Sequence, residues 1–192
     1  VEWGPLWNAV NFVATSTASE FRNGVAEHFD YDMLKDYYLF IELLLATDNH
    51  GKNMFWYAYD QQGPEGEKLG LAPWDLDGVL GARWNGKTDL TYAQQDFEDS
   101  LWINEHGQLT LYYNLERYCS NTWPQELKER YCALRASNWQ EESLKQRVAD
   151  YAALFAESGA DLRERDRWFL YHSDIASAAS YIESWLHDRI AW

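Results

Sequence analysis

Residues 32–59 read DMLKDYYLFIELLLATDNHGKNMFWYAY, and they predict a helix, a loop and a strand in succession. The first part, Asp32 to Ala46, carries apolar side chains at the spacing of one helix face, so it predicts a long core helix. Asp30 or Asp32 is suited to cap the start of that helix. Thr47 to Asn53 is a run of turn formers and polar groups, which predicts a tight loop directly after the helix.

A β-hairpin is expected after this loop. Met54 to Tyr59 is aromatic and strand-prone, and Lys68 to Trp74 is a second short strand-prone segment. Residues 61–67 (QQGPEGE) between them are turn formers, so the two segments predict an antiparallel pair. The hairpin ends in a second polar segment, PWDLDGVLG at Pro73 to Gly81.

The C-terminal half is expected to be helical, because four of its segments carry apolar residues at helical spacing: 109–119, 124–136, 141–157 and 174–190. Residues 82–107 are polar and rich in Gly, Asn and Asp, which predicts an irregular loop region. The predicted fold class is therefore α+β, mainly α. At 192 residues, with no internal repeat or linker-like segment, residues 1–192 are expected to form a single domain.

Composition and charge restrict the class of partner. Hydrophobic residues make up 46% of the chain, with eleven Trp, thirteen Tyr and eight Phe, which is typical of a globular protein. A formal charge of −15 repels phosphate backbones and anionic lipid surfaces, so we expect no nucleic-acid partner. No apolar stretch approaches the roughly 18 to 20 residues of a membrane span. The two cysteines, Cys119 and Cys132, are expected to be buried thiols.

Two carboxylates and an amide stand where the loop and the hairpin meet. Asp48 follows the helix C-terminus, where the helix dipole disfavours a negative charge by up to about 1 kcal/mol, so another role must explain this carboxylate. Asn53 stands five positions later, before the first strand, and Asp75 follows the second strand. A helix, an Asp-x4-Asn loop, a hairpin and then an Asp is the order found in protein-kinase-like active sites. Hard oxygen ligands of this kind suit Mg²⁺.

Three further residues near these positions have alternative interpretations. In an extended segment, Asp77 would face the same side as Asp75 and share one cation, whereas in a turn one of the two carboxylates would cap a backbone N–H. Lys52 either neutralises charge on a transferred phosphoryl group or is a solvated loop lysine. His50 either has the same functional role or forms a hydrogen bond that stabilises the loop.

These segments resemble the CotH (spore coat protein H) kinase family. The similarity is densest in Phe29 to Tyr38, Asp48 to Tyr59 and Pro73 to Gly81, and it is weaker in residues 181–192. The family shows a helix, an Asp…Asn-aromatic-aromatic loop and a Pro-Trp-Asp-x-Asp block followed by a glycine. The resemblance implies an atypical protein-kinase-like fold, and transfer of the γ-phosphoryl group of ATP to Ser or Thr hydroxyls of a protein substrate.

The resemblance also implies a role for each candidate residue. Asp48 would be the catalytic Asp, with Lys52 as a second catalytic candidate. Asn53 and Asp75 would bind the nucleotide through Mg²⁺ or Mn²⁺, and Asp77 would be a further metal ligand. A spore-coat, cell-envelope or secreted location is implied as well. Kinase-like folds need a first lobe with a glycine-rich phosphate cover, and nothing before Asp30 predicts its strands, so we expect this chain to be the C-terminal catalytic lobe of a longer protein.

Two other functions stay open at this point. The Trp- and Tyr-rich composition permits a carbohydrate-active domain, in which rings stack on sugars and two carboxylates act as acid and base. Against this, Trp56, Tyr57 and Tyr59 stand at strand-periodic positions that core packing explains. The other alternative is an inactive kinase-like binding module. The intact Asp48, Asn53 and Asp75 argue against it, and the expected missing lobe argues for it.

Overall fold

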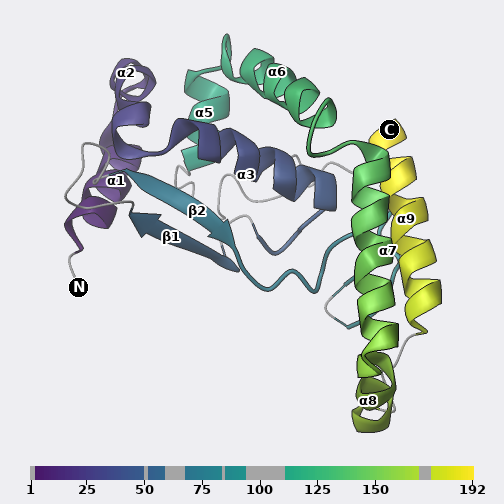
Figure 1. The fold of residues 1–192 in the computed structure, drawn as a ribbon. Coiled ribbons are helices and arrows are strands. Elements are labelled where there is room, and N and C mark those ends of the chain that lie inside the picture. The colour runs from purple at the N-terminus through teal and green to yellow at the C-terminus, as the bar shows by residue number, and fades with distance from the viewer. Residues whose placement is uncertain (1–2, 50–51, 59–67, 84, 94–110, 169–173) are drawn as a thin grey trace. The chain divides into compact units, whose positions relative to one another are not determined.

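The computed structural model describes residues 3–49, 52–58, 68–83, 85–93, 111–168 and 174–192. Within these residues the chain is mainly α-helical with one two-stranded antiparallel sheet, which confirms the predicted fold class (Figure 1). The elements are α1 (Gly4–Thr15), α2 (Ala18–His28), α3 (Tyr31–Leu44), β1 (Met54–Ala58), β2 (Leu69–Pro73), α5 (Leu111–Tyr118), α6 (Trp123–Arg135), α7 (Glu141–Glu157), α8 (Ala160–Arg167) and α9 (Ile175–Ala191).

The chain divides into two compact units, which are described separately. The first unit comprises Val1–Glu42, Ala46–Leu76 and Gln95–Tyr131, and the second comprises Leu43–Leu45, Asp77–Gln94 and Cys132–Trp192.

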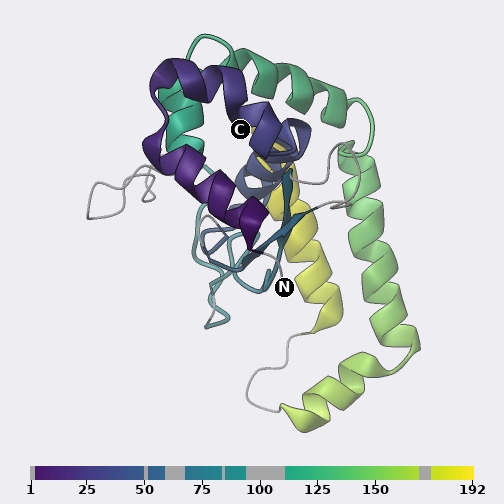
Figure 2. The same ribbon diagram turned by 90° about the vertical axis from the view of Figure 1, so that its left-hand side faces the viewer.

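The first unit begins with two helices, α1 and α2, which were not predicted from the sequence. α2 starts with a capping box, in which the Thr17 hydroxyl accepts from the Glu20 N–H and the Glu20 carboxylate accepts from the Thr17 N–H. It buries Phe21 and Val25 and packs against both α1 and α5 (Figure 2). The N-terminal helices thus add to the core of the first unit.

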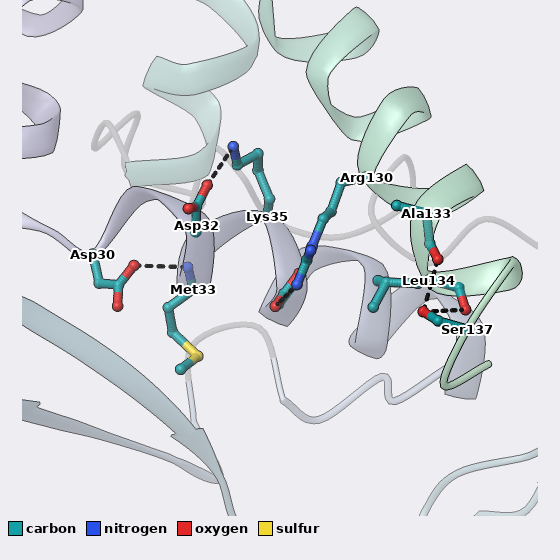
Figure 3. Close-up of polar contacts among 9 residues, drawn as sticks. Asp30, Asp32, Met33, Lys35, Arg130, Ala133, Leu134 and Ser137 are labelled. Carbon is teal, nitrogen blue, oxygen red and sulfur yellow. Dashed lines mark hydrogen bonds and ion pairs between the residues drawn. The ribbon is translucent and has the colours of Figure 1, made fainter.

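α3 is the predicted core helix, and its start is fixed by Asp30. The Asp30 carboxylate accepts a hydrogen bond from the Met33 N–H at 3.0 Å (Figure 3), and the Asp30 N–H donates to the Leu69 carbonyl at 2.9 Å. The N-terminus of α3 is therefore capped as predicted and tied to β2. Leu34, Tyr37 and Ile41 are buried on the face that the sequence pattern indicated.

α3 ends at Leu44, two residues before the predicted end. Leu45 has a φ of 51°, and the Ala46 N–H donates to the Ile41 carbonyl at 3.0 Å. This is the hydrogen bond of a Schellman motif, which stops a helix through one left-handed residue. The motif turns the chain directly into the Thr47–Asn53 loop.

The outer side of α3 is held by α6 through charge and aromatic contacts. Arg130 donates two hydrogen bonds to the Asp36 carboxylate, at 2.6 and 2.7 Å. Within α3, Lys35 pairs with Asp32 at 2.7 Å (Figure 3). The buried Trp123 ring lies 5.8 to 6.4 Å, between ring centroids, from three tyrosine rings, those of Tyr31, Tyr38 and Tyr112. A bidentate pair and a cluster of this kind hold α3 in a defined orientation.

The predicted hairpin is confirmed, with β1 and β2 inside the expected ranges. The strands pair antiparallel, from Met54 opposite Pro73 to Ala58 opposite Leu69. The predicted turn at residues 61–67 and Tyr59 lie outside the described residues. Because Met54 pairs with Pro73, Asn53 and Trp74 meet at one end of the sheet.

The second unit contains α7, α8 and α9. α7 packs against α9 and against α8. The predicted helices at 124–136, 141–157 and 174–190 correspond to α6, α7 and α9, and the one predicted at 109–119 corresponds to α5 in the first unit. Residues 85–93 are irregular, as expected, and the rest of the predicted loop up to residue 107 lies outside the described residues.

One prediction for the cysteines is wrong. Cys119 is buried, as expected, but Cys132 is exposed. Cys132 stands four residues after Lys128 on α6, and residues at this spacing share a helix face, which here is the exposed one.

Three side chains of α9 hold the irregular segment after residue 77. Tyr181 donates to the Leu80 carbonyl at 3.0 Å, Trp185 to the Leu90 carbonyl at 3.5 Å and Arg189 to the Tyr92 carbonyl at 2.6 Å. These three residues stand four positions apart, so they share one helix face. Residues 181–192, which carried the weaker family similarity, thus stabilise the segment that follows the Pro-Trp-Asp-x-Asp block.

Gly81 lies under this helix face and cannot be replaced without strain. Its φ is +81°, and a Cβ there would lie 2.5 Å from both the Trp185 Nε1 and the Tyr181 hydroxyl. Gly81→Ala is expected to lower the free energy of unfolding by about 2 kcal/mol or more, because a left-handed backbone strain and an overpacking strain add together. Urea unfolding would measure the loss.

Gly86→Ala is the matched control for this prediction. Gly86 has a similar φ of +78°, but no atom of the described residues lies within 4 Å of its added Cβ. Only the backbone cost, about 1 to 2 kcal/mol, is expected there. Equal losses in the two variants would contradict the proposed packing role of Gly81.

Candidate functional site

The loop after α3 carries Asp48 and Lys52, the two predicted catalytic residues. The Asp48 Oδ2 lies 3.0 Å from the Lys52 Nζ, and the side chains are 46% and 68% exposed. An ion pair with this exposure contributes at most about 1 kcal/mol to stability, so it does not hold the loop in place. Both groups instead remain accessible to a ligand. His50, the other loop candidate, lies outside the described residues.

The loop is held by Asn49, which the sequence analysis did not identify. Its side chain is 1% exposed, and its Nδ2 donates to the Asn53 carbonyl at 2.7 Å and to the Trp74 carbonyl at 2.8 Å. One amide group therefore connects the loop to the residue before β1 and to the residue after β2, at one end of the hairpin.

The backbone of Asn49 is anchored from α3. The Tyr37 hydroxyl donates to the Asn49 carbonyl at 2.7 Å. Burial raises the pKa of Tyr37 to about 12, so the hydroxyl remains a proton donor throughout the physiological pH range. The core helix thus fixes the loop through a neutral, buried hydrogen bond.

Asn53 and Asp75 are brought to the same end of the hairpin. Asn53 precedes β1, and its carbonyl accepts from the Trp74 N–H at 2.8 Å, so the residue next to Asp75 is paired with Asn53. Asn53 has a φ of 54° and Asp75 a φ of 57°. A left-handed conformation at a non-glycine residue costs about 1 to 3 kcal/mol and is found preferentially at functional sites, and Asn and Asp tolerate it best. Asp75 is exposed.

The structure decides between the two backbone alternatives for Asp77. Asp75 is left-handed, and Leu76 and Asp77 form a turn. The extended alternative, in which both carboxylates face one side by strand alternation, is therefore wrong. Asp77 belongs to the second unit, and its role as a metal ligand stays a prediction.

The aromatic residues of the hairpin fall into two groups. The Tyr57 ring lies over Gly70 and contributes to packing as predicted. Trp56 contacts Phe29, with ring centroids 5.6 Å apart, but it is exposed, so the prediction of core packing is wrong for this residue. Phe55 and Trp74 instead form an exposed edge-to-face pair with centroids 5.4 Å apart. Trp74 directly precedes Asp75, so this pair borders the candidate site.

The donor set fits a metal ion that is shared with a ligand. Among the described residues, no group of three or more His, Cys, Asp or Glu side chains is arranged to hold a metal. Asn53 and Asp75 offer one amide oxygen and one carboxylate. Mg²⁺ commonly takes one or two protein oxygens and completes its shell with water and phosphate oxygens, so these residues suit a metal–nucleotide complex better than a metal alone.

The comparison with known families identifies the family of the whole chain. The chain matches the family described as CotH kinase protein over residues 1–192. It belongs to the CotH kinase family. Membership of the CotH kinase family confirms the resemblance found in the sequence and suggests a kinase-like phosphotransferase. No curated protein and no solved structure matches the chain.

In this member of the CotH kinase family, the described helices include none with the length and apolar character needed to cross a membrane. The family match covers the chain as a whole and does not assign individual residues. The roles of Asp48, Lys52, Asn53, Asp75 and Asp77 therefore stay predictions.

Proposed function

We propose that this chain transfers the γ-phosphoryl group of ATP to Ser or Thr hydroxyls of a protein substrate, with Mg²⁺ or Mn²⁺, as the C-terminal catalytic lobe of a CotH-family kinase. The observation that supports this most is the meeting of Asn53 and Asp75 at one end of the hairpin, in left-handed conformations, directly after the loop that carries Asp48. This arrangement offers oxygen ligands and a proton acceptor in the order found in protein-kinase-like active sites.

Asp48 has the position and exposure of the residue that handles the substrate proton. The attacking hydroxyl oxygen forms a bond to the γ-phosphorus, the bond from that phosphorus to the bridging oxygen of ADP breaks, and the hydroxyl proton passes to the Asp48 carboxylate. Lys52 pairs with that carboxylate, its Nζ lying 3.0 Å from the Asp48 Oδ2. Its flexible, exposed side chain can exchange this partner for a phosphate oxygen and so neutralise charge there.

Asn53 and Asp75 have the role of positioning the phosphates. Asp75 offers a charged oxygen and Asn53 a neutral one, and the left-handed backbone at both residues is fixed by the hydrogen bonds around Trp74. A bound Mg²⁺ would supply charge neutralisation at the β- and γ-phosphate oxygens. Asp77 is proposed as a further metal ligand.

Metal and ATP are expected to bind synergistically to the intact protein. Two protein oxygens alone give weak Mg²⁺ affinity, and phosphate oxygens complete the shell, so ATP should strengthen metal binding by at least about tenfold. Calorimetric titration of Mg²⁺ with and without ATP measures this. Equal metal affinity in the two titrations would contradict the proposed site.

The same sample distinguishes the alternative functions. ATP binding without phosphoryl transfer to any hydroxyl-bearing substrate would favour an inactive binding module. Binding of oligosaccharides without ATP binding would favour a carbohydrate-active domain that uses the exposed Phe55–Trp74 pair.

A further inference from the structure

We infer that Asn49 is a positioning residue that couples Asn53 to Asp75, so that the two proposed metal ligands act as one site. This inference rests on the proposed function and adds a residue to it. Asn49 contacts neither the nucleotide nor the metal in this scheme. It acts on the backbone next to each ligand.

The geometry of the coupling follows from which carbonyls Asn49 holds. The Asn53 carbonyl belongs to the peptide that follows Asn53, and the Trp74 carbonyl belongs to the peptide that precedes Asp75. The Asn49 Nδ2 donates to both, at 2.7 and 2.8 Å. Each ligand residue therefore has one of its flanking peptide planes fixed by the same amide group.

These peptide planes need such support because both ligand residues are in a disfavoured conformation. A left-handed backbone at Asn53 and Asp75 persists only where the surrounding structure determines it. The Trp74 N–H also donates to the Asn53 carbonyl, so that carbonyl accepts two hydrogen bonds. Without Asn49, the loop and the strand end would keep only this one described hydrogen bond between them at this point.

The chemistry of the side chain explains why an amide is required. A primary amide carries two N–H donors on one nitrogen and can bridge two carbonyls, whereas a carboxylate at the same place would only accept. Asn49→Asp keeps the size of the side chain, removes both donors and turns an oxygen toward two carbonyl oxygens. Asn49→Ser removes the bridge without adding a charge and serves as the second variant.

Asn114→Asp is the matched control. Asn114 is also completely buried, and its Nδ2 also donates to a backbone carbonyl, that of Val13, at 2.9 Å. The same chemical change therefore occurs at the same burial in the same unit, away from the loop and the hairpin. It is expected to lower the temperature of thermal unfolding and to leave the metal site as it is.

The deciding measurement is a titration of the intact protein with Mn²⁺ in the presence of ATP, with free Mn²⁺ followed by electron paramagnetic resonance. Both Asn49 variants are expected to raise the Mn²⁺ midpoint by at least about tenfold, the scale expected when two partly buried hydrogen bonds are lost. Asn114→Asp should keep the wild-type midpoint. A midpoint in the Asn49 variants that equals that of Asn114→Asp would overturn the positioning role and leave the proposed function standing.

Hydrogen exchange of the wild-type protein tests the same coupling without the need for any variant to fold. With Mg²⁺ and ATP, hydrogen exchange is expected to slow in residues 52–58 and in residues 68–76 with one common midpoint, because Asn49 links these segments. Slowing in only one segment would overturn the coupling. If the wild-type protein shows no Mn²⁺–ATP binding at all, the proposed function fails and the role of Asn49 fails with it, an outcome distinct from equal midpoints.

Discussion

Asp48→Asn is expected to reduce phosphoryl transfer by about 10² to 10⁴-fold, the range lost when a positioned acid–base group is removed. Asparagine keeps the shape of the side chain but accepts no proton. Because Asp48 is half-exposed and its pair with Lys52 contributes little to stability, the free energy of unfolding should change by less than about 0.5 kcal/mol. Radiolabelled ATP incubated with the intact protein and hydroxyl-bearing substrates gives the rate.

The affinity for metal and ATP distinguishes catalysis from binding in this variant. Asp48 is not proposed as a metal ligand, so binding of Mg²⁺ and ATP should stay within about twofold of the wild type while the rate falls. A loss of binding as large as the loss of rate would mean that Asp48 holds the ligand instead of the proton.

Asp89→Asn controls for the loss of an exposed ion pair. Asp89 pairs with Arg83, and its side chain is 53% exposed, close to the 46% of Asp48. The Arg83 guanidinium lowers the pKa of Asp89, so this residue too is a carboxylate at neutral pH. Its replacement should leave transfer unchanged. A similar drop in both variants would show that net charge, and not the position of Asp48, causes the effect.

Sequence patterns predicted the elements that are specified by residues close together in the chain. α3 shows one apolar face and a carboxylate cap, and the hairpin shows two strand-prone segments around a turn. α8 was missed because Ala160–Arg167 has almost no apolar residues, so its helix leaves no hydrophobic pattern. α1 was missed because Trp7 and Val10 are exposed, which mixes apolar residues into its outer face.

The residue types of the candidate site could be predicted from the sequence, but the hydrogen bonds that connect its residues could not. The order of Asp48, Asn53 and Asp75 along the chain indicated where chemistry would lie. Asn49 showed no such signal, because its role depends on the backbone carbonyls of residues four and twenty-five positions away. Every residue carries a backbone carbonyl, so the sequence does not mark which carbonyls Asn49 will bind. The alternation argument for Asp77 failed because Asp75 takes a left-handed conformation, which the sequence does not reveal for an Asp.

Asp75→Asn is expected to weaken the binding of Mg²⁺ and ATP by at least about 10² and to reduce the rate together with it. Changes in the outer shell of a metal site typically cost about 10 to 100-fold, so loss of a direct charged ligand should cost at least as much. Asparagine tolerates the φ of 57° at this position, so the substitution removes a charge without adding backbone strain. Calorimetric titration and the radiolabel assay on the same preparation measure the two effects.

Asp77→Asn then decides whether the second carboxylate shares the ion. If Asp77 is a ligand, its loss should also weaken binding of Mg²⁺ and ATP, by less than the loss of Asp75, because Asp75 is the proposed principal anchor. If Asp77 only shapes the turn, binding should stay within about twofold and stability alone should change. Two results for Asp75→Asn would contradict its proposed role. If this variant binds metal and transfers the phosphoryl group as well as the wild type, Asp75 is not part of the site. If metal binding weakens but the rate does not, the bound ion is not the one at which the phosphoryl group is transferred.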